Sequence, residues 1–222
     1  MKGLRLSLIV ILAVSLVAIS AASADAARFR VLPPGSRVEG LPASQWSAIE
    51  FQAIFSIPAP DNPGLGAPWS DCYLERIGSA GLGIAFFLTS GTFTCEMPSG
   101  MTLIQPIIGS ECSTLEAPPF YGETPTELRD CAHTFVPANL QAIIDGVSIP
   151  DLGRYLVTSP LYRFTVPDDN VLGVPAGSGY SVAYGTYLML RLSPGQHTMH
   201  LAGSFPDFGF DYAWDYNITV TP

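Results

Sequence analysis

The sequence predicts a mainly β protein: a single antiparallel β-sandwich, jelly-roll-like, with one or two short helices. Three observations predict it. The 222-residue chain holds 20 prolines and 21 glycines, and these separate short apolar runs. Hydrophobic residues make up 48% of the chain, enough for one large core. Between Phe208 and Val220 an apolar residue recurs at every second position, which is the period of a strand with one buried face.

Two segments have a helical pattern. Apolar residues recur at helical spacing from Pro42 to Phe55; Ser44 is a candidate cap, and Pro58 ends the segment. A second, shorter helix is expected from Thr124 to His133. It begins with a capping threonine, a proline at the first helical position and Glu127 at the third.

The other apolar runs read as strands separated by turn residues. Pro106 inside one of these runs indicates an edge strand or a bulge, and Asp145-Gly146 is a hairpin turn signal. Strands are expected at residues 82–88, 92–97, 101–108, 154–166, 180–192, 196–202 and 208–220.

Residues 1–24 have the composition of a signal peptide. Lys2 and Arg5 supply a positive start, Leu6 to Ile19 is almost entirely apolar, and Ala22-Ser23-Ala24 offers small residues for cleavage. The apolar run is short for a membrane span, and no second one follows. We therefore expect residues 25–222 to form a single secreted domain, located outside the cell or in the periplasm, with no membrane span.

The negative net charge of the chain disfavours two kinds of partner, nucleic acid and anionic membranes. The formal net charge is −9 for the whole chain, and becomes about −11 when Lys2 and Arg5 leave with the signal segment. Such a surface does not suit nucleic acid or an anionic membrane. Acidity can serve solubility or attract Ca²⁺, and solubility is the simpler interpretation because no acidic run has the spacing of a calcium loop.

The four cysteines, Cys72, Cys95, Cys112 and Cys131, are expected to form two disulfides, since their number is even and the predicted compartment is oxidising. Three pairings are possible. We prefer Cys72–Cys95 with Cys112–Cys131, because each closes a loop of about 20 residues, worth roughly 3 kcal/mol. A zinc site would require close cysteine pairs, which are absent from the sequence.

Short motifs distributed over most of residues 46–220 give a resemblance. The chain resembles a widespread family of uncharacterised secreted bacterial proteins, and the resemblance implies export and one domain but brings no activity or catalytic residues. The motifs are Trp46, Phe51-Gln52, Ser56-Ile57-Pro58, Asn62-Pro63, Cys72, Phe87-Leu88, Cys95, Pro98-Ser99-Gly100, Pro106-Ile107, Glu111-Cys112-Ser113, Leu128-Arg129, Cys131, Asp145-Gly146-Val147, Ser159-Pro160, Pro194-Gly195, His197-Thr198 and Ile218-Thr219-Val220.

No group of residues forms a coherent catalytic or metal-binding motif, so no catalytic residue, cofactor or metal ligand is assigned. His197 and His200 fall on opposite faces of a strand, which does not suit one ion. Glu111 and Glu116 flank Cys112 on a tethered loop, where a site could be built, although an ion pair with Arg129 is the simpler account.

Aromatic residues in predicted loops are the best candidates for a binding surface, namely Trp69, Tyr73, Phe120 and Tyr121. The first functional hypothesis is a secreted, non-catalytic β-sandwich that binds an extracellular partner, a glycan being one candidate. The alternative is a secreted carboxylate-dependent hydrolase acting on a polysaccharide or an ester. It requires two acids from distant segments, such as Glu111 and Asp207, to meet in a cleft. Whether the protein is an enzyme stays open at this point, and the absence of a catalytic motif from the sequence favours a non-catalytic role.

Overall fold

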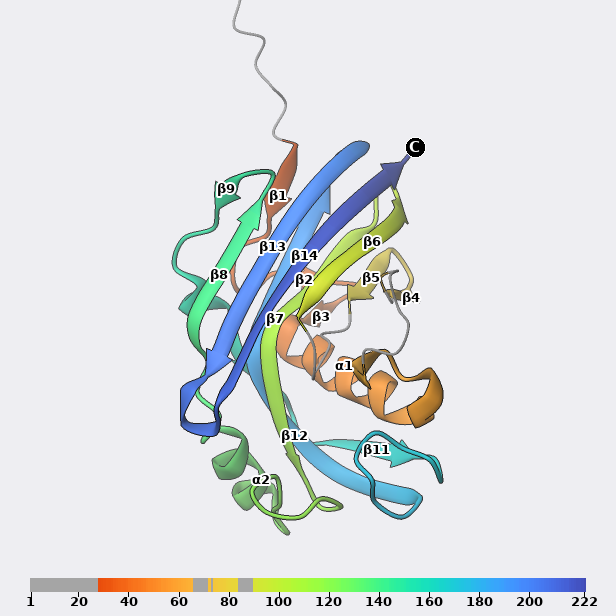
Figure 1. The fold of residues 1–222 in the computed structure, drawn as a ribbon, viewed down its shortest axis with the longest axis vertical. Helices are drawn as coiled ribbons and strands as arrows, with labels where there is room; N and C mark the ends of the chain where they lie inside the picture. Colours follow the sequence, from red (N-terminus) through yellow and green to blue (C-terminus); the bar gives the residue numbers. More distant parts are fainter. Residues whose placement is uncertain (1–27, 66–71, 73, 84–89) are drawn as a thin grey trace, which may run out of the picture.

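A computed structural model of the chain describes residues 28–65, 72, 74–83 and 90–222. The described residues are mainly β, as the sequence predicts, and most of their strands lie in two sheets that face each other (Figure 1). The predicted signal segment lies outside the described residues.

The larger sheet has the strand order β1-β12-β7-β5-β4, with β10 and β11 also pairing with β12. Pairing is antiparallel except between β5 and β7. Its strands are β1 (Phe29–Val31), β4 (Leu74–Ile77), β5 (Ala80–Gly83), β7 (Thr102–Ser113), β10 (Leu156–Thr158), β11 (Tyr162–Val166) and β12 (Gly177–Leu192).

The smaller sheet has the order β6-β14-β13-β8-β9 and includes the C-terminal strand. The pairing of β6 with β14 is parallel, so the predicted antiparallel arrangement has two exceptions among the described strands. The strands are β6 (Gly91–Pro98), β8 (Ala138–Ile144), β9 (Val147–Ser148), β13 (Gly195–Phe205) and β14 (Phe210–Thr221); β2 (Arg37–Val38) and β3 (Leu41–Pro42) form a separate pair.

Helix α1 (Ala43–Ser56) confirms the first predicted helix, but the expected cap is wrong. Pro42 occupies the N-cap position with extended dihedral angles, and no side chain caps the helix. Ser44 lies inside the first turn, where its carbonyl accepts a hydrogen bond of 2.9 Å from the Ser47 hydroxyl. A capping residue must have an extended backbone, and proline with its fixed φ already supplies that at position 42.

Helix α2 (Pro125–Ala132) has the predicted capping box. The Thr124 hydroxyl accepts from the Glu127 N–H at 3.2 Å, and the Glu127 carboxylate accepts from the Thr124 N–H at 3.1 Å. The helix ends at His133, as expected. Short 3₁₀ turns complete the helical segments, at Ala59–Asp61, Pro63–Leu65, Leu152–Tyr155 and Pro206–Phe208.

The core between the two sheets follows the period-two pattern of the sequence. Alternate residues of β14, from Trp214 to Val220, face alternate residues of β7 and β12, such as Leu103, Leu188 and Leu190, and all are buried. The opposite face of the larger sheet is covered by α1, whose Phe51, Ile54 and Phe55 pack on β11 and β12. We call the contact between the sheets the inter-sheet core.

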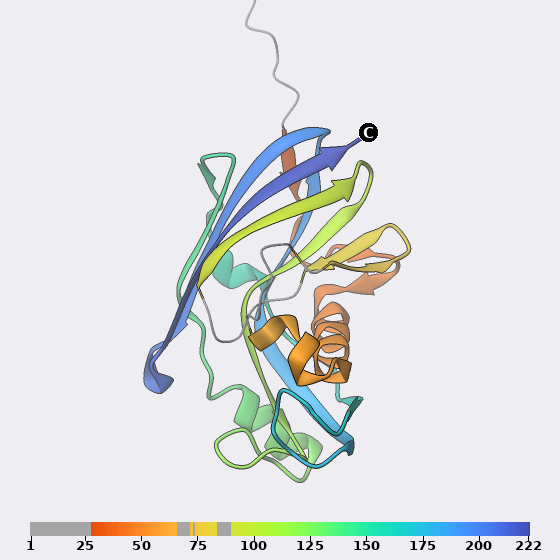
Figure 2. The same cartoon turned by 45° about the vertical axis from the view of Figure 1, so that its right-hand side comes forward.

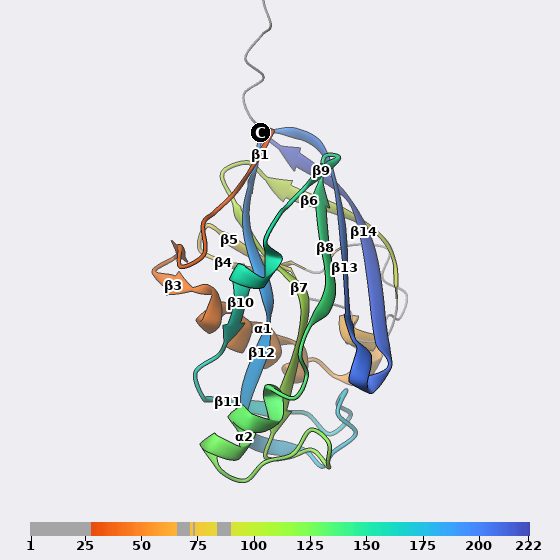
Figure 3. The ribbon, with the colours of Figure 1, turned by 90° about the vertical axis from the view of Figure 1, so that its left-hand side faces the viewer.

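The two sheets diverge toward one end of the molecule. In Figure 2 the β13–β14 hairpin swings away from β7 and β12 at its turn. Figure 3 shows α2 at the same end, beside the ends of β7 and β12. Aromatic side chains bridge the gap there, because Phe135, just after α2, packs against Phe205 and Phe208 of the hairpin.

A bulge in β7 precedes this open end, close to the position that Pro106 indicates. Pro106 and Ile108 pair with consecutive residues of β12, which leaves Ile107 without a partner across the ladder. Beyond it Gly109 lies opposite Gly185, and a Cβ on Gly185 would lie 2.7 Å from the Gly109 Cα. Only glycine allows this approach, so the pair fixes the path of both strands as they leave the inter-sheet core.

Candidate functional site

A pocket of about 540 Å³ lies at the open end of the molecule. Helix α1 and residues 171–174 form one side of it, and Phe205, Phe210 and Tyr212 of the β13–β14 hairpin form the other. Residues 109–111 of β7 lie between these sides, and the loop after β7 contributes Glu116, Ala117 and Phe120. A volume of 300–1,000 Å³ is ordinary for a small-molecule site.

The pocket lies where one edge of β7 has no neighbouring strand among the described residues. Within the described residues, the last pair between β5 and β7 is Leu82 opposite Ile104. At Ser113 the edge is covered again, because the loop residues Phe120 and Gly122 hydrogen-bond to the Ser113 backbone at 2.9 and 3.2 Å. Successive side chains of β7 point to opposite faces of the sheet. Because the pocket lies along this edge, between these two points, it is lined by Ser110 from one face and by Glu111 from the other.

The walls are aromatic and aliphatic. The ring of Phe120 stacks on that of Phe135 with centroids 4.8 Å apart, and Phe135 stacks on Phe208 at 4.0 Å. On the α1 side, Phe51 and Phe55 lie 5.6 Å apart and contact the strand residues beneath them. These contacts hold the rings in place before any ligand binds, which keeps the entropic cost of binding low.

Glu111 supplies the pocket's buried carboxyl group, and Glu116 is its partner. Glu111 is 5% exposed, accepts a hydrogen bond from the Ser181 hydroxyl and is hydrogen-bonded to Glu116. Burial, followed by the hydrogen bond and the charge of Glu116, raises the pKa of Glu111 well above its ordinary 4.5. The Ser113 hydroxyl donates to Glu116 at 2.8 Å and fixes it in the loop.

Further acidic groups lie behind Glu111. Glu50 of α1 is 2% exposed and accepts a hydrogen bond of 2.5 Å from the Tyr187 hydroxyl of β12. Burial raises the pKa of the Tyr187 and Tyr162 phenols well above 10, and the negative charges of Glu50 and Glu111 add to the effect. Among the described residues that line the pocket, none is lysine, arginine or histidine.

The hydroxyl of Ser110 is a polar group in the wall without a hydrogen-bond partner among the described residues. Ser110 is 8% exposed, and its oxygen is buried. An unsatisfied buried hydroxyl costs about 1–3 kcal/mol, so native proteins keep few of them. A ligand that reaches Ser110 would satisfy this group.

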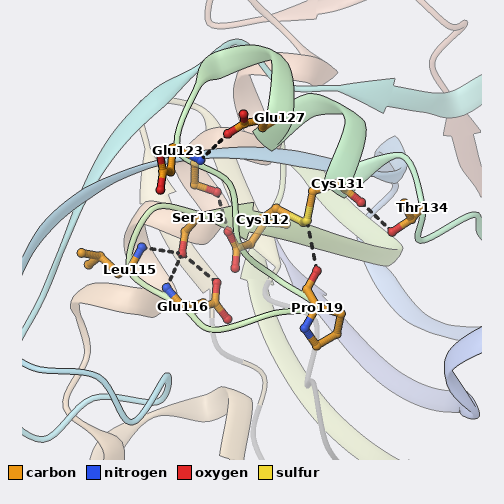
Figure 4. Close-up of a disulfide and its surroundings, with 11 residues drawn as sticks. Cys112, Ser113, Leu115, Glu116, Pro119, Glu123, Glu127, Cys131 and Thr134 are labelled. Carbon is orange, nitrogen blue, oxygen red and sulfur yellow. Dashed lines mark hydrogen bonds between the residues drawn. A yellow bond between two sulfur atoms is a disulfide. The ribbon is translucent and has the colours of Figure 1, made fainter.

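A disulfide holds the loop of the site, as Figure 4 shows. Cys112 is joined to Cys131 of α2; Ser113, the last residue of β7, follows Cys112, and Glu116 lies in the loop after that strand. The second disulfide joins Cys72 to Cys95, so the preferred pairing is confirmed, and the described residues contain no free cysteine. Glu111 and Glu116 are therefore carried on a segment anchored beside them.

The loop aromatics predicted as a binding surface have different outcomes. Trp69 and Tyr73 lie outside the described residues. Phe120 lines the pocket and stacks on Phe135. Tyr121 is 39% exposed outside the pocket lining, and its hydroxyl donates to Glu123 at 2.9 Å.

Two interactions considered for Glu111 and Glu116 are corrected. Neither residue forms an ion pair with Arg129 in the described part of the chain; their polar partners are each other and serine hydroxyls. Asp207 is exposed in the turn before β14 and does not line the pocket. The strand alternation of β7 turns Glu111 inward toward α1, and no pattern in the sequence specifies that orientation.

The two histidines of β13 have separate partners. His197 is buried, and its ring contacts the Asp145 carboxylate at 2.7 Å and the Ser193 carbonyl at 2.8 Å. His200 is paired with Asp215 at 2.7 Å on the outside of the smaller sheet. Both therefore fit structural roles.

Sequence reasoning missed Glu50 and the pairing of Glu111 with Glu116. A signal for Glu50 is present, because it is the one charged residue of α1 and lies between Ile49 and Phe51. A lone carboxyl group in an apolar helix is a candidate buried acid. The Glu111–Glu116 pair has no comparable local signal, since it depends on how the loop folds back over β7.

No protein-family model and no curated protein matches the chain. A solved structure, that of PbICP-C in complex with falcipain-2, is similar over 67% of this chain and 96% of its own, with 10% sequence identity and a TM-score of 0.24. A likeness this weak carries no argument. None of the helices in the described residues is both long enough and apolar enough to cross a membrane.

Proposed function

We propose that the protein is an extracytoplasmic, non-catalytic binding module that takes a small, largely apolar ligand into the pocket beside β7. The observation that carries this proposal is a preformed pocket of about 540 Å³ with aromatic walls and one polar pair, the buried Glu111 and the half-buried Glu116. Ligand sites combine such walls with a few placed polar groups. The two disulfides support a location outside the cytoplasm.

A glycan fits this pocket less well than an apolar molecule. Sugars present many hydroxyls that need hydrogen-bond partners, whereas the polar side chains of the lining are limited to Ser110, Glu111, Glu116 and the Tyr212 hydroxyl among the described residues. An apolar ligand with one polar end satisfies this set without leaving its own groups unpaired.

The test is binding of the neutral fluorescent probe N-phenyl-1-naphthylamine. We expect saturable fluorescence enhancement, lost in an Ala117→Trp variant, because Ala117 is exposed at the pocket and a large ring there blocks it. Tyr180→Ala is the matched control, since Tyr180 is 50% exposed and does not line the pocket. Probe binding that is absent, or equal in both variants, contradicts the proposal. Binding to a glycan array without binding of the probe would favour a glycan ligand instead.

A second candidate function, hydrolysis of an ester, is favoured by the hydrogen-bonded pair Glu111–Glu116. Two carboxyl groups that share a proton can act as an acid and a base. Direct hydrogen bonding brings them closer than the roughly 5 Å of retaining glycosidases, which disfavours polysaccharide cleavage. Turnover of p-nitrophenyl esters that is abolished in Glu116→Gln would support this function, and no turnover by the wild type would exclude it for those esters.

A further inference from the structure

We propose that the pocket selects an organic cation, an amine attached to an apolar or aromatic group, and that its ammonium group displaces the proton of the buried Glu111 carboxyl. This inference deepens the proposed function and rests on it. The volume and the apolar walls of the pocket do not specify the polar end of the ligand, and the inference assigns that end as an amine.

The first argument is the sign of the charge around the pocket. The ionisable side chains that line it are Glu111, Glu116 and Tyr212, all acids, and those behind Glu111 are Glu50, Tyr162 and Tyr187, also acids. No positively charged side chain lies in the described lining. A carboxylate ligand would be buried against like charge, whereas a monovalent cation is attracted.

The second argument is the state of the carboxyl pair. Burial, followed by the hydrogen bond and the charge of Glu116, raises the pKa of Glu111, so the Glu111 carboxyl keeps its proton to a higher pH than an exposed glutamate does. An ammonium group within reach of both replaces that proton, since it donates several hydrogen bonds and neutralises the second charge. The proton leaves to solvent as the ammonium group enters, so the net charge of the site is the same before and after binding.

The third argument is independent of the acids. The Ser110 hydroxyl is buried in the wall without a partner among the described residues. Aromatic faces also line the cavity, and rings such as Phe120 and Phe55 attract cations through their π electrons. Acidic side chains alone would suit any cation. The Ser110 hydroxyl and the aromatic rings, added to the acids, favour an organic cation.

The experiment compares three ligands of one shape: 2-naphthylmethylamine, 2-naphthylmethanol and 2-naphthoate, measured by titration calorimetry against the full secreted chain. We expect the amine to bind at least tenfold more tightly than the alcohol, and the carboxylate not to bind. Glu116→Gln should reduce the amine's advantage over the alcohol to less than about threefold. Glu111→Gln serves as a second variant, and Glu123→Gln, an exposed glutamate outside the lining, is the matched control.

Proton release provides a readout that a merely structural role of Glu116 would not change. Above pH 4.5, the amine's binding enthalpy should vary with the buffer's ionisation enthalpy in the sense of proton release, and this dependence should be lost in Glu111→Gln. Alcohol binding equal to the amine's, or tighter carboxylate binding, overturns this inference and leaves the proposed function standing. If none of the three ligands binds and the neutral probe also fails, the proposed function itself fails.

Discussion

The two ends of the β-sandwich differ in what fills the space between the sheets. At the closed end, alternate residues of β7, β12, β13 and β14 meet in the inter-sheet core, where Leu188, Leu190 and Trp214 are almost fully buried. At the open end the hairpin swings away (Figure 2), and a pocket lined by aromatic rings and Glu111 lies beside β7. The closed end therefore stabilises the molecule, while the open end keeps buried polar groups that cost stability and suit a ligand.

The largest effect is expected from truncating the closed end. Trp214→Ala should lower the free energy of unfolding by about 3–5 kcal/mol, because the residue is 2% exposed and its removal leaves a cavity. Phe210→Ala, in the pocket wall of the same strand, should cost less than about 1 kcal/mol, since Phe210 is 37% exposed. Urea denaturation of both variants measures the contrast, and equal losses would mean that the two ends do not differ.

Removing each disulfide in turn distinguishes an effect on protein stability from an effect on ligand binding. Replacing Cys112 and Cys131 together with alanine should cost about 3 kcal/mol and also weaken probe binding, because the loop that carries Glu116 and Phe120 loses its anchor. Replacing Cys72 and Cys95 should give a similar loss of stability with unchanged probe binding. Denaturation and fluorescence titration of both double variants test this, and loss of binding in both would show that the pocket depends on overall stability alone.

A smaller effect is expected from removing one hydroxyl at each end. Tyr187→Phe should cost about 1.5–3 kcal/mol, because the buried Glu50 carboxylate loses the hydrogen bond that this phenol donates at 2.5 Å. Tyr216→Phe in the inter-sheet core should cost less than about 1 kcal/mol, since the hydrogen bond that its oxygen accepts from Gln105, among the described residues, is a long one of 3.4 Å. Thermal denaturation of both variants measures the two losses of stability. A larger loss in Tyr216→Phe than in Tyr187→Phe would contradict this prediction.

The smallest effect is a pH dependence. The folded-state pKa of Glu111 is raised above 4.5, so the folded state binds this proton more tightly, and the associated stability is complete below about pH 4.5. It is lost at about 1.4 kcal/mol per pH unit as the pH rises from there to the folded pKa.

Glu111→Gln keeps the neutral shape and abolishes this titration. The unfolding free energy of the variant, relative to wild type, should therefore increase with pH above 4.5. Denaturation at a series of pH values gives this difference directly. A difference that is flat or decreases with pH would show that Glu111 is not a buried acid with a raised pKa.

The inter-sheet core and the start of α2 could be predicted from the sequence, and the pocket at the open end could not. Period two from Trp214 to Val220 specifies which residues of β14 enter the core, and the Thr124–Glu127 box specifies where α2 begins. These are local rules. The pocket depends on the bulge at Ile107, on the approach of Gly109 to Gly185 and on the loop that brings Glu116 to Glu111, which are contacts between distant segments.

The carboxyl state of Glu111 tests the central claim most directly. In protein labelled with ¹³C at the glutamate carboxyls, the Glu111 signal is assigned by its loss in Glu111→Gln and followed by NMR as the pH rises and as 2-naphthylmethylamine is added. We predict that it reports a protonated carboxyl in the free protein well above pH 4.5 and an ionised one when the amine is bound. A Glu111 that titrates at its ordinary pKa, or that stays protonated at saturating amine, would contradict the account.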